Sequence, residues 1–444
     1  MSGAAMVALR DLGVWSGGNT PSKANAAYWT AGTVPWVSPK DMKVDEITSS
    51  EDQVSEVAVK QGRVSMVPEG SVLLVTRSGI LSHTLPVAVT KTPVTINQDL
   101  KALTPRPGVL PKYVAHALRG ASRRILKECS KHGTTVASIE TNALLDFEIP
   151  LVELDEQRRI VAEIEKQFSR LDEAVVNLKR VKANLARQRA AILSAAVRGE
   201  LLGSTLPPPE GDHPDLAPAV DLPAGWSWAA MAEVCEVVAS GSTPKADEMT
   251  SGSGEVPFIK VYNLGFDGAL DFSVKPTFIR RAVHAGPLAR SRCLPGDVLT
   301  NIVGPPLGKV SVVPDAFPEW NINQAIVTFR TGPRILNRLL AYWLMAPPLQ
   351  RRIERTTKAT AGQHNVQVST CRKLVLPLPP LAEQRRIVAE LDRRLSIVRE
   401  VEAEVDANLQ RAQALRQAVL AQAFTGTARS LDFGSYARRT GDVL

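Results

Sequence analysis

The chain contains two copies of one plan, and this internal repeat constrains its fold more than any other feature. The sequence EQRRIVAE occupies positions 156–163 and occurs again at 383–390, which is 227 residues later (156 to 383). From there both copies continue without a gap, through helix-forming sequence, to Gly199 and Gly426. A repeat with so long a period indicates a duplicated domain rather than a solenoid.

Upstream of each copy, shorter signals return in the same order while the residues between them diverge. These signals are Thr20-Pro21 and Thr243-Pro244, Val34–Val37 and Val256–Ile259, Gly70–Leu73 and Gly296–Leu299, Ile96–Gln98 and Ile322–Gln324, and Pro150-Leu151 and Pro377-Leu378. Between the signals lie short apolar runs broken by Gly, Pro, Asn and Ser, a pattern typical of largely β domains.

The repeat therefore predicts two divergent domains that alternate with two similar helices. The predicted segments are a first domain over 1–150, a long helix over 151–202, a Pro-rich linker over 203–225, a second domain over 226–378, a second long helix over 379–426 and a tail over 427–444. Within the first domain we expect a helix over 111–127, which has a proline at its first turn. Asp155 is the expected N-cap of the first long helix.

Both long helices carry apolar residues at alternating steps of three and four, the spacing of a coiled-coil seam. The predicted seam comprises Val161, Ile164, Phe168, Leu171, Val175, Leu178, Lys182 and Leu185 in the first helix, and Val388, Leu391, Leu395, Val398, Glu402, Val405 and Leu409 in the second. Such a stripe needs an apolar partner, and the nearest one is the duplicate helix. The alternatives are the core of an ordinary bundle and a homodimer interface.

If the two halves are related by a pseudo-two-fold axis, the helices pack antiparallel with their midpoints near Leu178 and Val405. This register predicts that Lys182 faces Glu402, in a layer where both seam residues are charged and of opposite sign. It also places Arg189 beside Leu395 and Arg416 beside Phe168, where the arginine stems can lie along apolar surface.

Composition limits the class of protein. A length of 444 residues suits two to four domains, and a formal charge of +8 is compatible with a polyanionic partner or with a mildly basic cytosolic protein. The cysteines form no C-x-x-C pair, which indicates free thiols in a reducing compartment. We read no signal peptide and no apolar run of membrane-spanning length, and we expect a soluble cytoplasmic protein without a membrane partner.

Motifs for catalysis are not found in the sequence. The chain has no Gly-rich cofactor turn of a methyltransferase, and Gly304–Lys309 is one residue short of a phosphate-binding loop. Its histidines form no nucleophile or metal constellation. We therefore expect a recognition or assembly protein without a metal or a cofactor of its own.

The sequences at the helix entrances resemble those of specificity subunits of type I restriction-modification enzymes. The resemblance rests on PLPPLAEQ at 377–384 and its copy PLVELDEQ at 150–157, and on Leu222–Trp226 followed by Gly241–Pro244. It covers nearly the whole chain, in the family's order; Val152-Glu153 departs from the pattern. The resemblance implies an α+β fold in which two target-recognition domains are separated by the intramolecular antiparallel coiled coil.

The resemblance further implies that each domain reads one half of an asymmetric, interrupted site in double-stranded DNA. The paired helices would fix the gap and carry two modification (methyltransferase) subunits, which bring S-adenosylmethionine. Restriction subunits, up to two, would bring ATP and magnesium, and this chain would perform no chemistry. The rival hypotheses are a protein scaffold without DNA readout and a stand-alone enzyme.

Candidate DNA contacts are polar residues in Gly- and Ser-rich turns, for which a solvated loop side chain is the alternative. In the first domain they are Lys23, Ser38, Lys40, Arg77, Ser78, Gln98, Lys131, His132 and Thr134. In the second they are Lys245, Lys260, Asn263, Asn301, Lys309, Gln324, Lys358, Gln363 and His364. The recurrence of Asn-Gln at 97–98 and 323–324 favours a shared structural turn at those positions.

Overall fold

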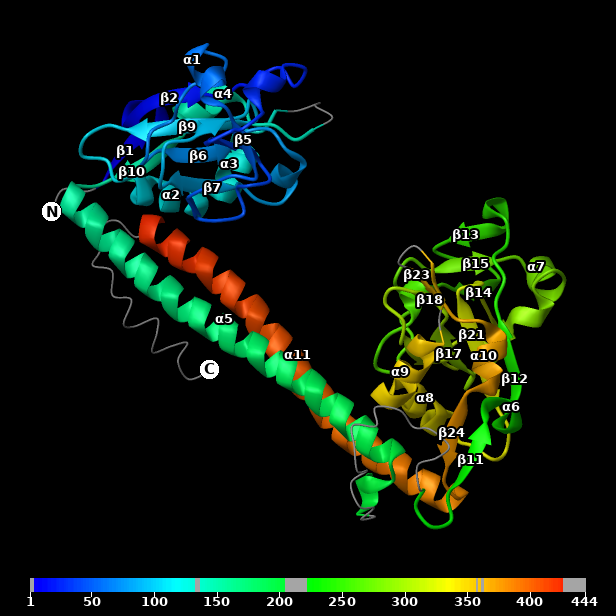
Figure 1. The fold of residues 1–444 in the computed structure, drawn as a ribbon. Coiled ribbons are helices and arrows are strands. Elements are labelled where there is room, and N and C mark those ends of the chain that lie inside the picture. Colours follow the sequence, from blue (N-terminus) through cyan, green and yellow to red (C-terminus); the bar gives the residue numbers. More distant parts are fainter. Residues whose placement is uncertain (1–3, 132–135, 204–221, 357, 361–362, 426–444) are drawn as a thin grey trace. The chain divides into compact units, whose positions relative to one another are not determined.

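The structure is a computed structural model that describes residues 4–131, 136–203, 222–356, 358–360 and 363–425. Its contacts divide the chain into two compact units, Met1–Leu178 with Ala407–Leu444, and Lys179–Asp406. Each unit holds one largely β domain and a part of each long helix, α5 (Leu154–Val197) and α11 (Leu381–Thr425) (Figure 1). This architecture confirms the predicted α+β fold class.

The β domain of the first unit is built on a five-stranded sheet with the order β2-β9-β6-β7-β4. Its strands are β2 (Gly13–Gly17), β9 (Leu100–Pro105), β6 (Val72–Val75), β7 (Val87–Thr90) and β4 (Glu46–Ile47). A three-stranded sheet adds β5 (Asp52–Val54), β3 (Val34–Val37) and β8 (Thr95–Ile96), and β1 (Ala5–Ala8) pairs with β10 (Glu148–Leu151). The helices are α1 (Glu56–Lys60), α2 (Pro111–Gly120), α3 (Ser122–Glu128) and α4 (Thr141–Asp146).

The second unit repeats this plan with additions. Its main sheet contains β12 (Cys235–Ser240), β21 (Ile326–Thr331), β17 (Val298–Asn301) and β19 (Val310–Val312). A second sheet contains β13 (Met249–Ser251), β15 (Thr277–Ile279), β14 (Val256–Ile259), β20 (Trp320–Ile322) and β16 (Arg292–Cys293). The remaining strands are β18 (Val303–Gly304), β22 (Lys358–Thr360), β23 (Gln363–Asn365), β11 (Ser227–Ala230) and β24 (Val375–Leu378). The helices are α6 (Met231–Val234), α7 (Arg281–Ala285), α8 (Asn337–Met345), α9 (Pro347–Arg355) and α10 (Val368–Lys373).

The strand pairings show that the two domains share one topology. In each, the strand that enters the domain pairs antiparallel with the strand that leads into the long helix, β1 with β10 and β11 with β24. A parallel pair also occurs in both domains: β3 with β8 in the first and β14 with β20 in the second. The sequence repeat therefore extends through the divergent domains as a repeat of backbone pairings.

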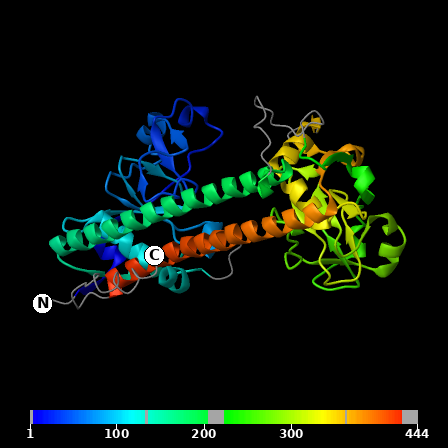
Figure 2. The ribbon, with the colours of Figure 1, turned by 90° about the horizontal axis from the view of Figure 1, so that it is seen from below.

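Within each unit the two long helices pack antiparallel, as Figures 1 and 2 show. In the first unit, Ile160 and Ile164 of α5 share an apolar cluster with Leu420 and Ala423 of α11. In the second unit, Ile387 and Leu391 of α11 share a cluster with residues from the end of α5. Early residues of one helix thus meet late residues of the other, which is the direction that we predicted.

The predicted seam is most deeply buried near the β domains. Side chains with at most a tenth of their surface exposed are Val161, Ile164, Phe168, Leu185, Val388, Leu391, Leu395, Val398 and Val405. Those with intermediate exposure are Leu171, Val175, Leu178, Glu402 and Leu409, whereas Lys182 is exposed. On α5 the seam residues from Leu171 to Lys182 are less buried than those before them, whereas Val405 of α11 remains buried.

The ion pairs at the charged layers differ from the predicted one. Lys182 donates to Asp406, with 2.5 Å between Nζ and Oδ1, while Glu402 lies 4.0 Å from Arg189. The predicted pairing of Lys182 with Glu402 is therefore wrong by about one helical turn. Long side chains reach along the helix to a carboxylate that seam spacing alone does not identify. The predicted contact of Arg416 with Phe168 is present, with the guanidinium 4.5 Å from the ring centre.

Two local predictions also need correction. The long helix begins at Leu154, so Asp155 lies in its first turn and is not its N-cap. The helix predicted over 111–127 is two helices, α2 and α3, which meet at Ala121. The apolar spacing continues across this break, which explains why sequence periodicity did not reveal it.

A buried glutamine joins each domain to its long helix. Gln157 is fully buried, accepts from the Leu110 amide at 2.8 Å and donates to the carbonyls of Gly108 and Val152. Gln384 repeats this arrangement with the Leu336 amide and the carbonyls of Arg334 and Pro379. The repeated Glu-Gln motif is thus explained by a side chain that satisfies the backbone just before α2 or α8.

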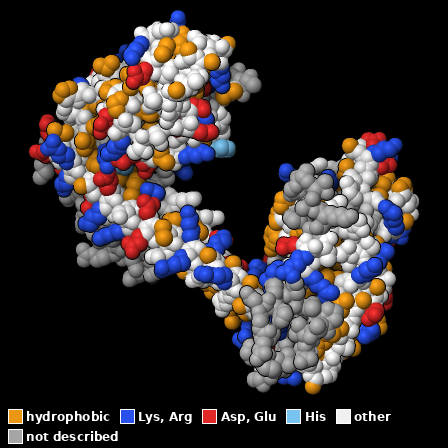
Figure 3. Space-filling view, in the orientation of Figure 1, with side chains coloured by type: hydrophobic (Ala, Val, Ile, Leu, Met, Phe, Trp, Pro, Cys, Tyr) orange, Lys and Arg blue, Asp and Glu red, His pale blue; other side chains and the backbone are white. Residues whose placement is uncertain are grey.

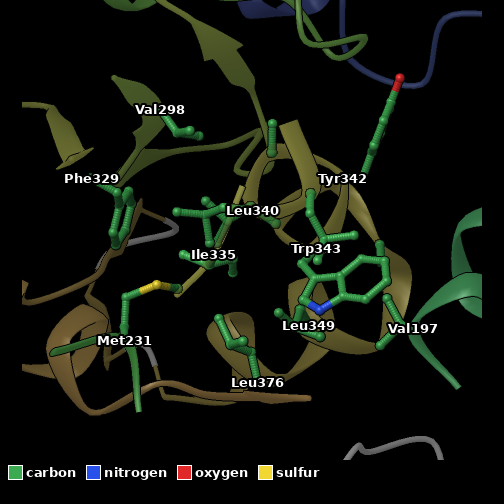
Figure 4. Close-up of a cluster of buried hydrophobic side chains, with 14 of the residues drawn as sticks. Val197, Met231, Val298, Phe329, Ile335, Leu340, Tyr342, Trp343, Leu349 and Leu376 are labelled. Carbon is green, nitrogen blue, oxygen red and sulfur yellow. The ribbon is translucent and has the colours of Figure 1, made fainter. Parts of the chain in front are cut away.

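At each junction an aromatic side chain, from a different position of α2 or α8, donates to the corresponding proline carbonyl. The Tyr113 hydroxyl donates to the Pro150 carbonyl at 2.8 Å, and the Trp343 indole donates to the Pro377 carbonyl at 2.7 Å. Figure 4 shows the Trp343 ring beside Val197, the last residue of α5, within the large core cluster of the second unit. Each domain is therefore attached to its helices by apolar packing and by directed hydrogen bonds.

We predict that Gln384→Ala destabilises the second domain by about 2–4 kcal/mol, since it leaves a buried amide and two carbonyls without a partner. Chemical denaturation followed by tryptophan fluorescence measures this change, because Trp343 lies in the same core. The matched control is Arg385→Ala, next to it on the exposed side of the helix. Equal unfolding midpoints for the two variants would contradict the prediction.

Candidate nucleic-acid interface

One edge of the first domain contains a hollow that brings several predicted residues together. Its volume is about 650 Å³, and we call it the Arg77 hollow. It is lined by Pro39, Arg77, Ser78, Gly79, Asp99, Val136 and Ser138. These residues come from the segments after β3, after β6 and after β8 and from the segment before α4, so four separate parts of the sequence form it.

Arg77 is held in this hollow by both its backbone and its side chain. Its amide donates to the Asp99 carbonyl, and its Nε donates to the Asp99 carboxylate at 2.6 Å. Asn97 fixes Asp99 in turn, because its Nδ2 donates to the carboxylate at 3.1 Å and its Oδ1 accepts from the Asp99 amide at 3.0 Å. The arginine side chain remains 56% exposed, so an oriented cation faces solvent.

Other candidates of the first domain lie around this edge. Gln98, next to Asp99, accepts a hydrogen bond from Thr20, and the exposed Lys23 follows that threonine. Ser38 is 6% exposed and donates to Asp41. Lys40 forms ion pairs with Glu51 and Asp52, and Lys131 is exposed. His132 and Thr134 lie outside the described residues.

The second domain has the same backbone at this edge. The Thr76 amide donates to the Asp99 carbonyl at 2.7 Å, and the Ile302 amide donates to the Ala325 carbonyl at 2.8 Å. Arg77 pairs with Ser138 across a β-bridge, and Val303 pairs with Asn365 where β18 meets β23. Since these backbone bonds are equivalent in the two domains, Val303 occupies the position of Arg77, and Ala325 occupies the position of Asp99.

Two candidates of the second domain hold the backbone instead of facing solvent. Asn263 is 1% exposed, accepts from the Lys260 amide and donates to two loop carbonyls. Asn301 is 3% exposed, donates to the Val303 and Pro306 carbonyls and accepts from the Lys309 amide. Their polar groups shape the loops that carry neighbouring residues.

The other candidates of the second domain are distributed over its edge. Lys309 is partly exposed and donates to the Val261 carbonyl at 3.1 Å. Lys245 is exposed, and Gln324 is exposed and accepts from Thr243. Lys358, Gln363 and His364 lie in the paired strands β22 and β23. All of these positions remain predicted DNA contacts.

The repeated Thr-Pro and Asn-Gln signals form one structural device in each domain. Thr20 donates to Gln98, and Thr243 donates to Gln324. A Cβ on Gly18 would lie 2.1 Å from the Ile96 carbonyl oxygen, and one on Gly241 would lie 2.1 Å from that of Ile322. Glycine is therefore required where the two segments cross, which supports the structural interpretation of the repeated turn.

A second hollow, of about 470 Å³, lies at the junction of the first domain with its helices. It contains His116, which is 5% exposed and whose pKa is lowered to about 3, chiefly by burial and then by nearby cations such as Arg119. Lys112 pairs there with Glu165 at 2.5 Å, an ion pair that Arg338 and Asp392 repeat in the second unit. This hollow belongs to the attachment of the domain.

The described residues contain no group of three or more His, Cys, Asp or Glu side chains placed to hold a metal ion. The four cysteines are free and buried, and burial raises the pKa of both Cys235 and Cys293 to about 12. These thiols are therefore poor nucleophiles. No helix in the described part of the chain has the length and apolar character needed to cross a bilayer.

Charge is mixed over the surface. On the face seen in Figure 3, Lys and Arg side chains are interspersed with Asp and Glu over both units.

Asp99, which orients Arg77, was not among the predicted site residues. The sequence signal for it was the residue after the repeated Ile-Asn-Gln, which is Asp99 in one copy and Ala325 in the other.

Comparisons with known proteins agree with this architecture. The chain is 42% identical over 158 residues to the EcoR124I/EcoR124II specificity subunit of Escherichia coli, which is 36% of this chain and 39% of that protein. It is 26% identical over 330 residues to the EcoBI specificity subunit of Escherichia coli, which is 71% of this chain and 65% of that protein. These alignments span less than two thirds of the relatives' own length.

Solved structures share the fold. A chain from a study of complex assembly and conformational transition in a type I restriction-modification system matches with a TM-score of 0.70 and 22% identity, over 96% of this chain and 99% of that one. The HsdS subunit of Thermoanaerobacter tengcongensis matches with a TM-score of 0.50 and 21% identity, over 96% and 97%.

The family model described as "Type I restriction modification DNA specificity domain" matches residues 1–180 and 223–407, which together are most of the chain. Both matched segments begin at or just before a β domain and end within a long helix. The chain therefore belongs to the type I restriction-modification DNA specificity family.

Proposed function

We propose that this chain is the DNA-recognition subunit of a type I restriction-modification complex and reads a bipartite, asymmetric site. The observation that carries the proposal is one scaffold used twice with different side chains, as at Arg77 and Val303. Base edges in the major groove are distinguished by specific side chains, so unlike residues on equal backbones suit unlike half-sites. The net charge of +8 suits contact with a polyanion.

The chain would supply no chemistry of its own. Two modification subunits would bring S-adenosylmethionine, and restriction subunits would bring ATP and magnesium, acting in the cytoplasm on double-stranded DNA. The names of the relatives, which are specificity subunits of restriction enzymes, support this division of roles.

The long helices would set the spacing between the half-sites. α5 alone contains 44 residues, which corresponds to about 66 Å at 1.5 Å per residue. The antiparallel packing in each unit gives this helix a partner, so it can act as a stiff element. The rival proposal, a scaffold that binds proteins and no DNA, differs in its response to salt.

We expect the affinity of the full chain for duplex DNA to fall steeply with salt. If six to ten phosphates are contacted, affinity drops about 10³- to 10⁵-fold between 50 and 200 mM salt, because bound cations are released from DNA. Fluorescence anisotropy with a labelled duplex of random sequence measures this slope. Binding that does not respond to salt, or no binding, would favour the scaffold.

Replacing residues 1–150 with the corresponding domain of a relative should change one half of the recognised site and leave the other half as it was. The reason is that each domain has its own sheet, core and edge. Methylation-sensitive sequencing of DNA from cells that carry the exchanged chain identifies both halves. A change in both halves, or in neither, would refute modular reading.

A further inference from the structure

We propose that Arg77 reads a guanine in the half-site bound by the first domain, and that Asp99 positions it. This inference rests on the proposed DNA-recognition function and names one base that it reads. The argument uses the geometry of the Arg77–Asp99 pair, its place in the Arg77 hollow and its replacement in the second domain.

The ion pair leaves the arginine's outer edge available. Arg77 contacts Asp99 through Nε alone, and among the residues that the structure describes its two terminal nitrogens have no protein partner. By contrast, Arg330 in the second domain uses both Nε and Nη2 on Asp297, at 3.0 and 2.8 Å, and is only 28% exposed. Arg77 therefore keeps its pair of terminal N–H donors available for a ligand, whereas Arg330 already uses one of its terminal nitrogens on Asp297.

A fork of two N–H donors matches the O6 and N7 acceptors of guanine, which lie side by side in the major groove. An exposed ion pair contributes little to stability, about 0–1 kcal/mol. Stabilisation of the fold is therefore not a sufficient explanation for the pairing of Arg77 with Asp99. A fixed guanidinium, however, loses less side-chain freedom on binding DNA. The bonds from Asn97 and the Arg77 backbone to Asp99 provide that fixation.

The surroundings allow a base pair to approach. Gly79 has open space where a Cβ would lie, and the Arg77 hollow is open beside Ser78 and Ser138. The second domain keeps the backbone bonds of this edge but has Val303 and Ala325 in place of the pair. Both members are absent together, so the second half-site has no guanine reader at the equivalent position.

The test uses the full chain in the complex isolated from its host, with selection from randomised duplex DNA and then binding to single-base variants. Arg77→Ala should lose discrimination at one guanine of one half-site by about 5- to 150-fold, the range for one bidentate contact. Arg10→Ala, which removes an exposed arginine paired with Asp146 in the same domain, is the matched control and should preserve every preference.

Asp99→Ala should weaken the same preference without changing the salt slope or the melting temperature. Asp99→Asn, which keeps an oxygen that can accept from Nε, should restore part of it. A merely structural role would lower the melting temperature and leave the base preference unchanged.

The gain-of-function variant Val303→Arg with Ala325→Asp should add a guanine preference to the other half-site. This variant also carries the test if Arg77→Ala fails to fold. No added preference from it in that case would overturn the inference.

The outcomes separate the two levels of the proposal. If the unmodified complex selects no DNA sequence, DNA recognition itself fails and this inference fails with it. If the complex selects a bipartite site and Arg77→Ala leaves every position unchanged, or relaxes a base other than guanine, only the reading by Arg77 is overturned.

Discussion

The apolar seam between α5 and α11 is the interaction on which the rest of the structure depends. A helix of 44 residues that exposes an apolar stripe is not stable alone in water, because helical stability comes mainly from the burial of such a face. In the first unit the seam buries Ile164 against residues of α11, and in the second it buries Leu391 against residues of α5. Each fully buried aliphatic side chain contributes about 1.5–3 kcal/mol.

The junctions attach the β domains to the paired helices. Gln157 and Gln384 are hydrogen-bonded to the backbone that precedes α2 and α8, and also to a carbonyl just before their own long helix. A buried amide that is satisfied in this way fixes the direction in which the domain leaves the helix, since any rotation leaves a buried group unpaired. The same reason explains why the junction sequence is nearly identical in the two copies while the domains are not.

The two domains differ in side chains where their shared backbone reaches solvent. The glycine crossing and the Thr-Gln contact occur in both domains because they close the same turn against the same strands. One residue beyond that turn, Asp99 and Ala325 differ, and Arg77 and Val303 differ with them. A fixed backbone with variable side chains at one edge can change what is recognised without a change in the fold.

The sequence by itself determined the duplication, the order of domains and helices, the antiparallel seam and the α+β class, because these follow from long, regular patterns. It also identified Arg77 as a candidate, but as one polar loop residue among many. Only the tertiary structure decided that Asp406, not Glu402, pairs with Lys182, that Asn263 and Asn301 are buried in their loops, and that Asp99 orients Arg77. The physical reason is that periodicity reports which face of an element is buried, whereas contacts between side chains depend on reach and on segments that meet only after folding.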